Sequence, residues 1–489
     1  MRKYAVSMVL VGLLLTALSV WQVLSAPKGL RVVKLDAQGT PVTVFLAENG
    51  QAPDRPVILI GHGFAGSGTV MRGFALTLAH AGYNVLTWDF AGHGANSRAL
   101  GLSGQRDALV QDAERALGEA SRQGLVSSER IAIMGHSMGS GVALAYGQLH
   151  PETKATIAVS PVMRQVTPEH PQNLLLIAGS QEPGFLETAR TLLARAGGEG
   201  GNTVQGTARR LVMIPGANHL TILFSDKAIH SILEWLDEVF GAQPGAEPYT
   251  DRRMTWFSLG MVGTLLVATG LAWRVRPGPE TSPARSIWRR LASIAAGVLA
   301  ATFLLWVVGQ TGLEINSIFG LIVGGYLMFW FALAGISGLV ILSARPKYFS
   351  LKTGLAGMLT FVVLWLGVGL LSHLVWLPWL MILPRLVLWP LAAACLLPWF
   401  LLQEELVRGQ GWLGQAAAWL AHSILLLGGL LLAMQITPGI GFLILIMPVF
   451  PIFFGLHALA AGPYRGGWPF ALSGALFTAW MLLVVFPLG

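Results

Sequence analysis

The chain has 489 residues, of which 54% are hydrophobic and only 11% are charged, and this composition excludes an ordinary soluble globular protein. The formal net charge of +8 would suit a nucleic-acid partner, but many arginines stand beside apolar segments, where basic residues act as topology signals. We therefore expect no nucleic-acid partner, and the single cysteine, Cys395, excludes an intrachain disulfide.

The first 26 residues have the pattern of an export signal. Arg2 and Lys3 precede a long apolar stretch, and the small residues Ser25 and Ala26 follow it. We expect residues 1–26 to be a cleaved signal peptide or a retained signal anchor. Either outcome exports the segment that follows.

Residues 27–243 have the composition of a soluble domain, in which short β-type runs alternate with helical ones. This alternation predicts an α/β fold with a mainly parallel, doubly wound sheet. The expected strands are 42–47, 56–60, 84–88, 131–134, 155–159, 173–178 and 210–214. The expected helices are 70–81, 105–122, 140–150, 186–196 and 226–240.

A serine stands between one of these strands and the next helix, in the sequence Gly-His-Ser-Met-Gly at 135–139. A strand that turns sharply into a helix lifts such a hydroxyl clear of the sheet, and small flanking residues relieve the crowding. The pattern is typical of a nucleophile elbow, with a purely structural glycine turn as the alternative. We predict Ser137 to be the catalytic nucleophile.

The loop after the strand at 56–60, in the sequence VILIGHGFAGSG, indicates where an oxyanion would be held. A loop in this position can direct a backbone N–H towards the developing charge. The N–H groups of Phe64 and Met138 would together form the hole. A glycine-rich turn without a catalytic part is the alternative.

A histidine in RLVMIPGANHL follows the last predicted strand and lies in a loop. An imidazole suits proton transfer near neutral pH. His150 and His170 come too early in the chain, and His230 falls in a helical pattern. We therefore predict His219 to be the general base.

A carboxylate follows the strand at 173–178, in the sequence GSQE. Such a group can accept the Nδ1 hydrogen of the histidine and stabilise the imidazolium. We predict Glu182 for this role, with Glu169 or Glu187 as alternatives if the loop runs differently.

Over about residues 30–243 the chain resembles the α/β-hydrolase superfamily, in the segments GHGFAGS, GYNVLTWDFAGHGAN, GHSMGSG, LLLIAGSQE and IPGANH. The order serine, acid, histidine is the one known for that superfamily. The resemblance implies a serine hydrolase of the carboxylesterase or lipase type, with no cofactor and no metal. The residues it implies are Ser137 as nucleophile, His219 as base, Glu182 as acid, and Phe64 and Met138 as oxyanion donors.

The same resemblance implies that Asp89 and His93 shape a loop and that His136 packs beneath the elbow. Only a short segment, SPVMRQVTPEHPQ, separates the strands at 155–159 and 173–178, so we expect no large lid. The pocket would be open, or covered by the loop at 197–208 or by the membrane. We expect a lipid-like or small acyl substrate, an ester or thioester, and contact with membrane lipids; the oligomeric state stays open.

Residues 244–254 are a predicted linker into a membrane domain that spans 255–489. Eight apolar runs there are long enough to cross a bilayer, which requires about 20 residues each. They are 255–273, 291–309, 317–342, 354–374, 386–403, 414–433, 440–460 and 469–487.

Basic residues between the first two runs predict the orientation. The segment 274–290 holds Arg274, Arg276, Arg285, Arg289 and Arg290 against Glu280 alone, which places it in the cytoplasm. Alternation then places Arg345, Lys347, Lys352, Arg408 and Arg465 inside, while Arg385, Arg252 and Arg253 count against it. We expect a multi-pass protein of the cell (inner) membrane, with the hydrolase domain on the extracytoplasmic face.

One alternative makes the membrane part a transporter and the hydrolase fold its binding or regulatory head. Ionisable residues within the apolar runs would mark a path for the transported species. The ionisable residues there are His373, Glu404, Glu405, His422 and His457. We expect most of them to snorkel or to lie at the interface near the ends of the spans.

A third interpretation comes from QEELVRG and FFGLH, which resemble the CAAX-protease and bacteriocin-processing family of intramembrane enzymes. The spacing from Phe453 to His457 fits that family. Arg408, however, follows the Glu404-Glu405 pair one residue too soon, which on a helix rotates the side chain by about 100°. We rank this interpretation last.

Overall fold

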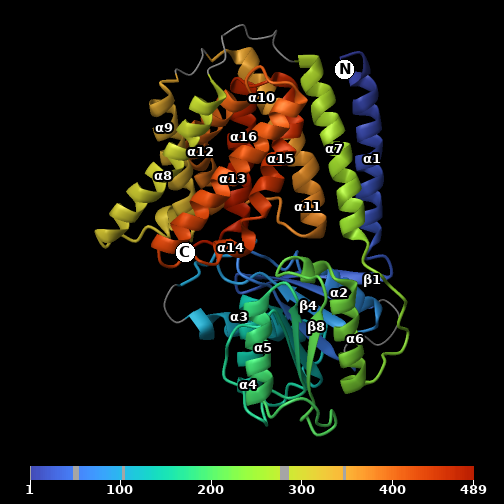
Figure 1. Ribbon diagram of the computed structural model, residues 1–489. Helices are drawn as coiled ribbons and strands as arrows, with labels where there is room; N and C mark the ends of the chain where they lie inside the picture. The colour runs from blue at the N-terminus through green and yellow to red at the C-terminus, as the bar shows by residue number, and fades with distance from the viewer. Residues whose placement is uncertain (1, 48–53, 102–104, 276–285, 345–348) are drawn as a thin grey trace. The chain divides into compact units, whose positions relative to one another are not determined.

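The computed structural model describes residues 2–47, 54–101, 105–275, 286–344 and 349–489, and the chain divides into two compact units (Figure 1). The α/β unit comprises Trp21–Trp256, Ser372–Pro378 and Pro487–Gly489. The helical unit comprises Met1–Val20, Phe257–Leu371 and Trp379–Phe486. Five of the predicted topology signals lie outside the described residues: Arg276, Glu280, Arg285, Arg345 and Lys347.

The α/β unit contains an eight-stranded sheet of order β1-β2-β4-β3-β5-β6-β7-β8. The β1–β2 and β2–β4 pairs are antiparallel and the remaining pairs are parallel. The strands are β1 (Leu30–Ala37), β2 (Thr40–Ala47), β3 (Val57–Gly61), β4 (Asn84–Trp88), β5 (Ile131–His136), β6 (Ala155–Val159), β7 (Leu174–Gly179) and β8 (Arg209–Ile214). The predicted fold class is confirmed.

Helices cover both faces of this sheet, as Figure 1 shows. The helices are α2 (Arg72–His80) and α6 (Asp226–Phe240) on one face, and α3 (Gln105–Arg122), α4 (Met138–Leu149) and α5 (Pro183–Arg195) on the other. In β7, Leu175 and Ile177 join the core beneath α2 and α6, while Leu174 and Leu176 join the core beneath α4 and α5. Because both faces are buried, the central strands β3 and β7 contain only apolar residues and glycine, whereas the edge strand β8 begins with Arg209 and Arg210.

Strand β1 was not predicted. Its exposed residues alternate with partly buried ones, and Arg31 and Lys34 interrupt any apolar run. A two-residue turn joins it to β2: Gln38 and Gly39 have φ values of 56° and 82°. A two-residue turn with positive φ at both residues matches the right-handed twist of the strands. The turn therefore fixes the register of β1 against β2, which the pattern of apolar residues in β1 does not fix.

The helical unit accounts for the strongly apolar composition. Among the described residues, nine segments are long and apolar enough to cross a membrane. They are Ala5–Ser25 (α1), Arg253–Val275 (α7), Ile287–Gln310 (α8), Gly324–Leu342 (α9), Leu351–Val375 (α10 and α11), Leu383–Val407 (α12), Trp412–Ile436 (α13), Leu443–Tyr464 (α14 and α15) and Trp468–Val485 (α16). Eight of these correspond to the predicted runs, and α1 corresponds to the export signal.

Three predicted runs are less regular than expected. The run at 317–342 begins with a 3-10 turn at Ile318–Gly320 and becomes α-helical only from Gly324, because Phe319 and Val323 have φ near 60°. The run at 354–374 contains α10 (Leu351–Leu364), a π-helical turn at Trp365–Gly369, and α11 (Leu370–Val375). The run at 440–460 divides into α14 (Leu443–Ile446) and α15 (Val449–Ala461), with Pro448 between them.

Glycines allow close contact between helices in this unit. A Cβ on Gly335 of α9 would overlap the backbone of α12 at Pro398 and Trp399, and one on Gly297 of α8 would overlap the carbonyl oxygen of Ala334. Small residues at such crossings let helix backbones approach, which is how apolar helices associate where the hydrophobic effect is weak.

Candidate active site

Four polar side chains lie at the carboxyl edge of the sheet, each in the connection that follows one of four neighbouring strands. Ser137 follows β5, Ser160 follows β6, Glu182 follows β7 and His219 follows β8. These four strands are adjacent in the sheet. Residues more than 80 positions apart in the chain are therefore brought to one place.

Ser137 occupies a strained turn between β5 and α4. Its φ and ψ are 54° and −116°, a conformation that non-glycine residues rarely adopt. A Cβ on Gly139 would lie 2.5 Å from the carbonyl oxygen of Gly61, and a Cβ on Gly135 would overlap the carbonyl of Gly139. Both positions therefore require glycine.

His219 connects Ser137 to Glu182 by hydrogen bonds. Its Nε2 lies 3.1 Å from the Ser137 hydroxyl oxygen, and its Nδ1 lies 2.9 Å from Oε2 of Glu182. A carboxylate only accepts, so Nδ1 carries the hydrogen and Nε2 accepts the hydrogen of the serine hydroxyl. The His219 and Glu182 side chains are 9% and 3% exposed, so little water competes for these bonds. The arrangement can take a proton from Ser137 and hold the resulting imidazolium.

Two rings fix the plane of the His219 imidazole. Phe185 stacks on it at 4.3 Å between centroids and 21° between planes, and the His136 ring lies 4.6 Å away. His136 Nε2 also donates to the carbonyl oxygen of His219, at 3.0 Å. Burial lowers the pKa of His136 well below 6.5, with smaller contributions in the same direction from His219 and His62. His136 is thus a neutral donor that anchors the loop carrying His219.

The two alternative carboxylates lie elsewhere. Glu169 is exposed, and Glu187 is exposed and pairs with Arg190 at 3.5 Å. Of the three candidate acids, the structure brings only Glu182 to His219.

The loop after β3 lies against the elbow. A Cβ on Gly63 would lie 2.9 Å from Nδ1 of His136, so this loop passes close to β5. His62 Nδ1 donates to the carbonyl of Gly63 at 2.8 Å, and its Nε2 accepts from the N–H of Phe90 at 3.0 Å. Burial also lowers the pKa of His62, so its ring stays neutral and can donate at Nδ1 while it accepts at Nε2. Phe64 follows in this loop, and Met138 begins α4.

The loop after β4 is held by Asp89. Its carboxylate accepts the N–H of Gly68 at 2.7 Å and the N–H of Ala95 at 2.8 Å. His93 Nδ1 donates to the carbonyl of Ala91 at 2.9 Å. These contacts shape the loop and do not involve Ser137.

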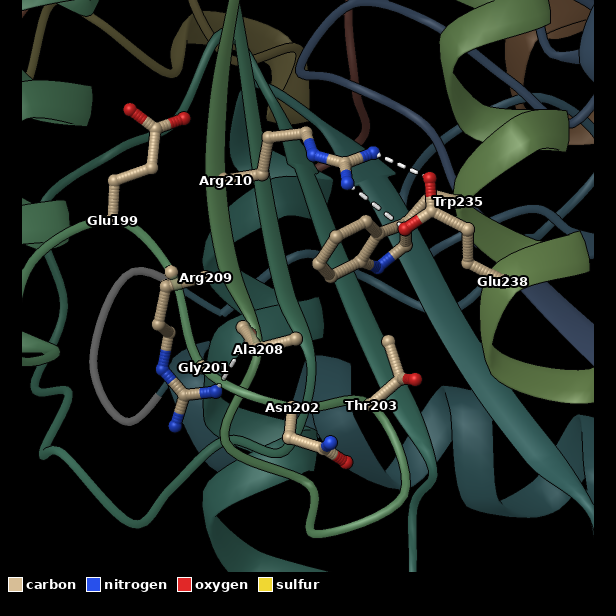
Figure 2. Close-up of a pocket in the computed structure, with 10 residues that line it drawn as sticks. Glu199, Gly201, Asn202, Thr203, Ala208, Arg209, Arg210, Trp235 and Glu238 are labelled. Atoms are coloured by element: carbon tan, nitrogen blue, oxygen red, sulfur yellow. Dashed lines mark hydrogen bonds and ion pairs between the residues drawn. The ribbon is translucent and has the colours of Figure 1, made fainter.

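The loop at 197–208, one of the three alternatives for what lies over the pocket, does not cover Ser137. It precedes β8, so it lies at the amino edge of the sheet, the opposite edge from the serine. It borders a cavity of about 410 Å³ that is also lined by Arg209, Arg210, Trp235 and Glu238 (Figure 2).

The charged groups of this cavity bind within the chain. Both Arg210 Nη atoms donate to Glu238 at 2.8 Å, and the guanidinium lies 4.7 Å from the Trp235 ring centroid. Arg209 donates to the carbonyls of Gly206, Ala208 and Pro168. These contacts stabilise the loop, and we assign the cavity no part in acyl chemistry.

Four of the five ionisable residues that the sequence places in the apolar runs are buried within the helical unit: Glu404, Glu405, His422 and His457. Glu404 accepts from the N–H of Gly467 at 2.6 Å and from Arg408 Nε at 2.9 Å, and Arg408 also pairs with Glu405 at 2.6 Å. His457 Nε2 lies 3.0 Å from the Ser473 hydroxyl.

His422 Nδ1 lies 3.4 Å from the amide nitrogen of Gln403. His373, the fifth of these residues, is half-buried and belongs to the α/β unit. Arg385, a buried residue that was considered only as a topology signal, donates to the carbonyls of Leu483 and Phe486. Pairing inside a helix bundle satisfies polar groups that lie away from the ends of the spans.

Comparisons with known proteins agree with this fold. A family profile described as serine aminopeptidase, S33, matches residues 52–190. The chain is 29% identical over 192 residues to Epoxide hydrolase A of Mycobacterium tuberculosis, covering 36% of this chain and 57% of that protein. It is 30% identical over 106 residues to Cutinase 2 of Thermobifida cellulosilytica, covering 21% of this chain and 38% of the cutinase. The chain thus spans 57% or less of these relatives' own length.

Solved structures similar to this chain include a CIB-like hydrolase from Thermoplasma acidophilum, at 20% identity and a TM-score of 0.35, which covers 42% of this chain and 97% of the hydrolase. A membrane phospholipase A described as a bacterial virulence factor is 16% identical with a TM-score of 0.35, covering 49% of this chain and 99% of the phospholipase.

Proposed function

We propose that this protein, which joins an α/β-hydrolase domain to a set of apolar helices that fit a membrane domain, is a serine hydrolase that cleaves ester or thioester bonds. The observation that carries the proposal is the unbroken chain of hydrogen bonds from the Ser137 hydroxyl through His219 to Glu182. The serine is strained, the imidazole is held between rings and the carboxylate is buried. The strain, the ring packing and the burial each cost folding stability or conformational entropy. Together the three residues form a nucleophile, a base and an orienting acid.

The proposed reaction has two steps. In the first, His219 Nε2 takes the Ser137 proton as Oγ attacks the acyl carbon, and the imidazolium then protonates the departing alcohol or thiol. In the second, a water molecule gives its proton to His219 and attacks the acyl-enzyme, which releases the carboxylic acid and restores the serine. Glu182 stabilises the imidazolium in both steps without taking its proton.

The oxyanion of each tetrahedral intermediate would be held by the backbone N–H groups of Phe64 and Met138. The close passage of the β3 loop beside the elbow supports this assignment, because it brings the two segments together at Gly63 and His136. Loss of one such donor typically costs about 10²-fold or more in rate.

The substrate class rests on two lines of support. Similarity to a cutinase favours an ester. Fusion to apolar helices favours a lipid-like or membrane-associated acyl compound. Basic residues at the end of α7 and the start of α8, Arg274, Arg289 and Arg290, support a cytoplasmic position for the segment between them, and hence an extracytoplasmic hydrolase domain.

A fluorophosphonate probe tests the proposal directly. Whole cells that express the full chain should show a labelled 52 kDa protein, and cells with Ser137→Ala should not. A chromogenic ester series of varied acyl length would then define the substrate. Absence of labelling in intact and broken wild-type cells would refute the hydrolase, whereas labelling confined to broken cells would refute only the orientation.

A further inference from the structure

The Glu182 carboxylate accepts three hydrogen bonds, and only one of them comes from His219. Oε2 accepts from His219 Nδ1 at 2.9 Å. Oε1 accepts from the Ser160 hydroxyl at 2.7 Å and from the N–H of Gly179 at 2.6 Å. The two oxygens thus have separate partners, and the orientation of the carboxylate is determined at Oε1.

Ser160 is placed for this contact by β6, which lies between the strands that carry Ser137 and Glu182. It is fully buried, and its N–H donates to the carbonyl of Ile177 at 2.7 Å. Its φ is 47°, a left-handed conformation that is uncommon for a residue with a side chain. Such a conformation in a fully buried residue is held by its surroundings and here directs the hydroxyl at Glu182.

We infer that Ser160 is a positioning residue: its hydroxyl holds Oε1 of Glu182 so that Oε2 is aligned with Nδ1 of His219. This inference rests on the proposed function. Ser160 is buried and has no position from which to touch substrate. Its contribution therefore reaches the reaction through Glu182 and His219, and it acts on turnover and not on substrate binding.

The test uses Ser160→Gly in the full chain. Glycine adopts a φ of 47° without strain, so this variant removes the hydroxyl while favouring the native backbone. We expect kcat to fall about 10- to 100-fold, which is the range for loss of a hydrogen bond to a charged group. KM should stay within about twofold. Ser160→Ala should show the same fold-loss in kcat, although glycine suits the backbone better. Titration with the fluorophosphonate counts the folded sites, so that kcat is given per folded site.

A matched control is available in the same strand. Thr156 is fully buried, and its hydroxyl has no hydrogen-bond partner among the residues that the structure describes. Thr156→Val removes a buried hydroxyl without touching Glu182, so kcat should be unchanged.

A double-mutant cycle separates positioning from a general structural effect. In the Glu182→Ala background Ser160→Gly should have no further effect on kcat, because the carboxylate it acts on is gone. The inference would be overturned by an unchanged kcat in Ser160→Gly, or by an equal fractional loss of kcat in the wild-type and Glu182→Ala backgrounds. In either case an active wild-type protein would leave the proposed function standing. Wild type without ester turnover or labelling would overturn both.

Discussion

The strain at Ser137 predicts an unusual order of stability among variants that lack the proposed nucleophile. A non-glycine residue held at φ 54° and ψ −116° costs about 1–3 kcal/mol, and alanine at this position keeps that cost. Glycine removes it but gives the unfolded chain more freedom, which costs about 0.5–1 kcal/mol. The difference centres on about 1 kcal/mol in favour of Ser137→Gly, or about 2–4 °C in Tm for a domain of 150–250 residues.

Thermal proteolysis of the full chain in detergent measures this difference. The protein is heated in steps and pulsed with protease, and the surviving α/β unit is quantified. Ser231 in the middle of α6 provides the reversed control, since it is not among the residues with positive φ. There Ser231→Gly should be less stable than Ser231→Ala by about 1 kcal/mol.

Both Ser137 variants should lack ester hydrolysis. The reasoning is refuted if Ser137→Gly melts at or below the temperature of Ser137→Ala while the Ser231 pair behaves as expected. That result would mean that the elbow accepts a side chain without strain.

Three further predictions follow from the site. Glu182→Gln should keep the fold but lower kcat on a chromogenic ester by about 10³-fold or more, because the imidazolium loses its anion; a loss under tenfold would contradict this role. Burial lowers the pKa values of His136 and His62 below 6.5, so stability should be complete above about pH 6.5 and fall as pH decreases, because the unfolded chain binds protons that the folded rings do not. Thermal proteolysis between about pH 5 and about pH 7 should show a slope of up to about 1.4 kcal/mol per pH unit for each histidine, reduced in His136→Gln; an identical slope in that variant would count against it. Gly135→Ala should abolish both phosphonate labelling and stable expression, since its Cβ would overlap the Gly139 carbonyl and overpacking of this kind costs about 3 kcal/mol or more; normal labelling would show that the turn can open.

The fold was predictable wherever both faces of an element are buried. β4 and β6 have the predicted bounds because a strand covered by helices on both faces is a short, mostly apolar run. β1 escaped prediction because it lies at the edge of the sheet, where Arg31 and Lys34 break the run. Its signal was the Gln38-Gly39 turn, which local backbone chemistry favours and hydropathy does not report.

The residues of the candidate site could be predicted only where a sequence motif follows a recognisable strand. Ser137, His219 and Glu182 each lie in the connection after a run that reads as a strand, and the structure brings them together. Ser160 was missed because strand order is a tertiary property, although a hydroxyl directly after β6 in the sequence AVSP was a usable sign.

Two features could not be predicted from the sequence, for related reasons of geometry. The loop at 197–208 precedes its strand, so the parallel direction of β8 carries it to the far edge of the sheet. The ionisable groups of α12, α13 and α15 were judged by their distance from the ends of apolar runs. Burial depends on which face of a helix they occupy, and hydropathy averaged along a run does not record that face.

The order of the strands has a consequence for biogenesis. Ser137 follows the fifth strand to be synthesised, whereas the proposed acid, Glu182, follows the seventh and the proposed base, His219, follows the eighth. A chain interrupted before residue 219 would therefore carry the Ser137 hydroxyl without its proposed general base, and that hydroxyl would be unreactive. Ser137 would become reactive only when β8 joins the sheet, so a phosphonate probe applied during synthesis would report completion of the domain and not merely its presence.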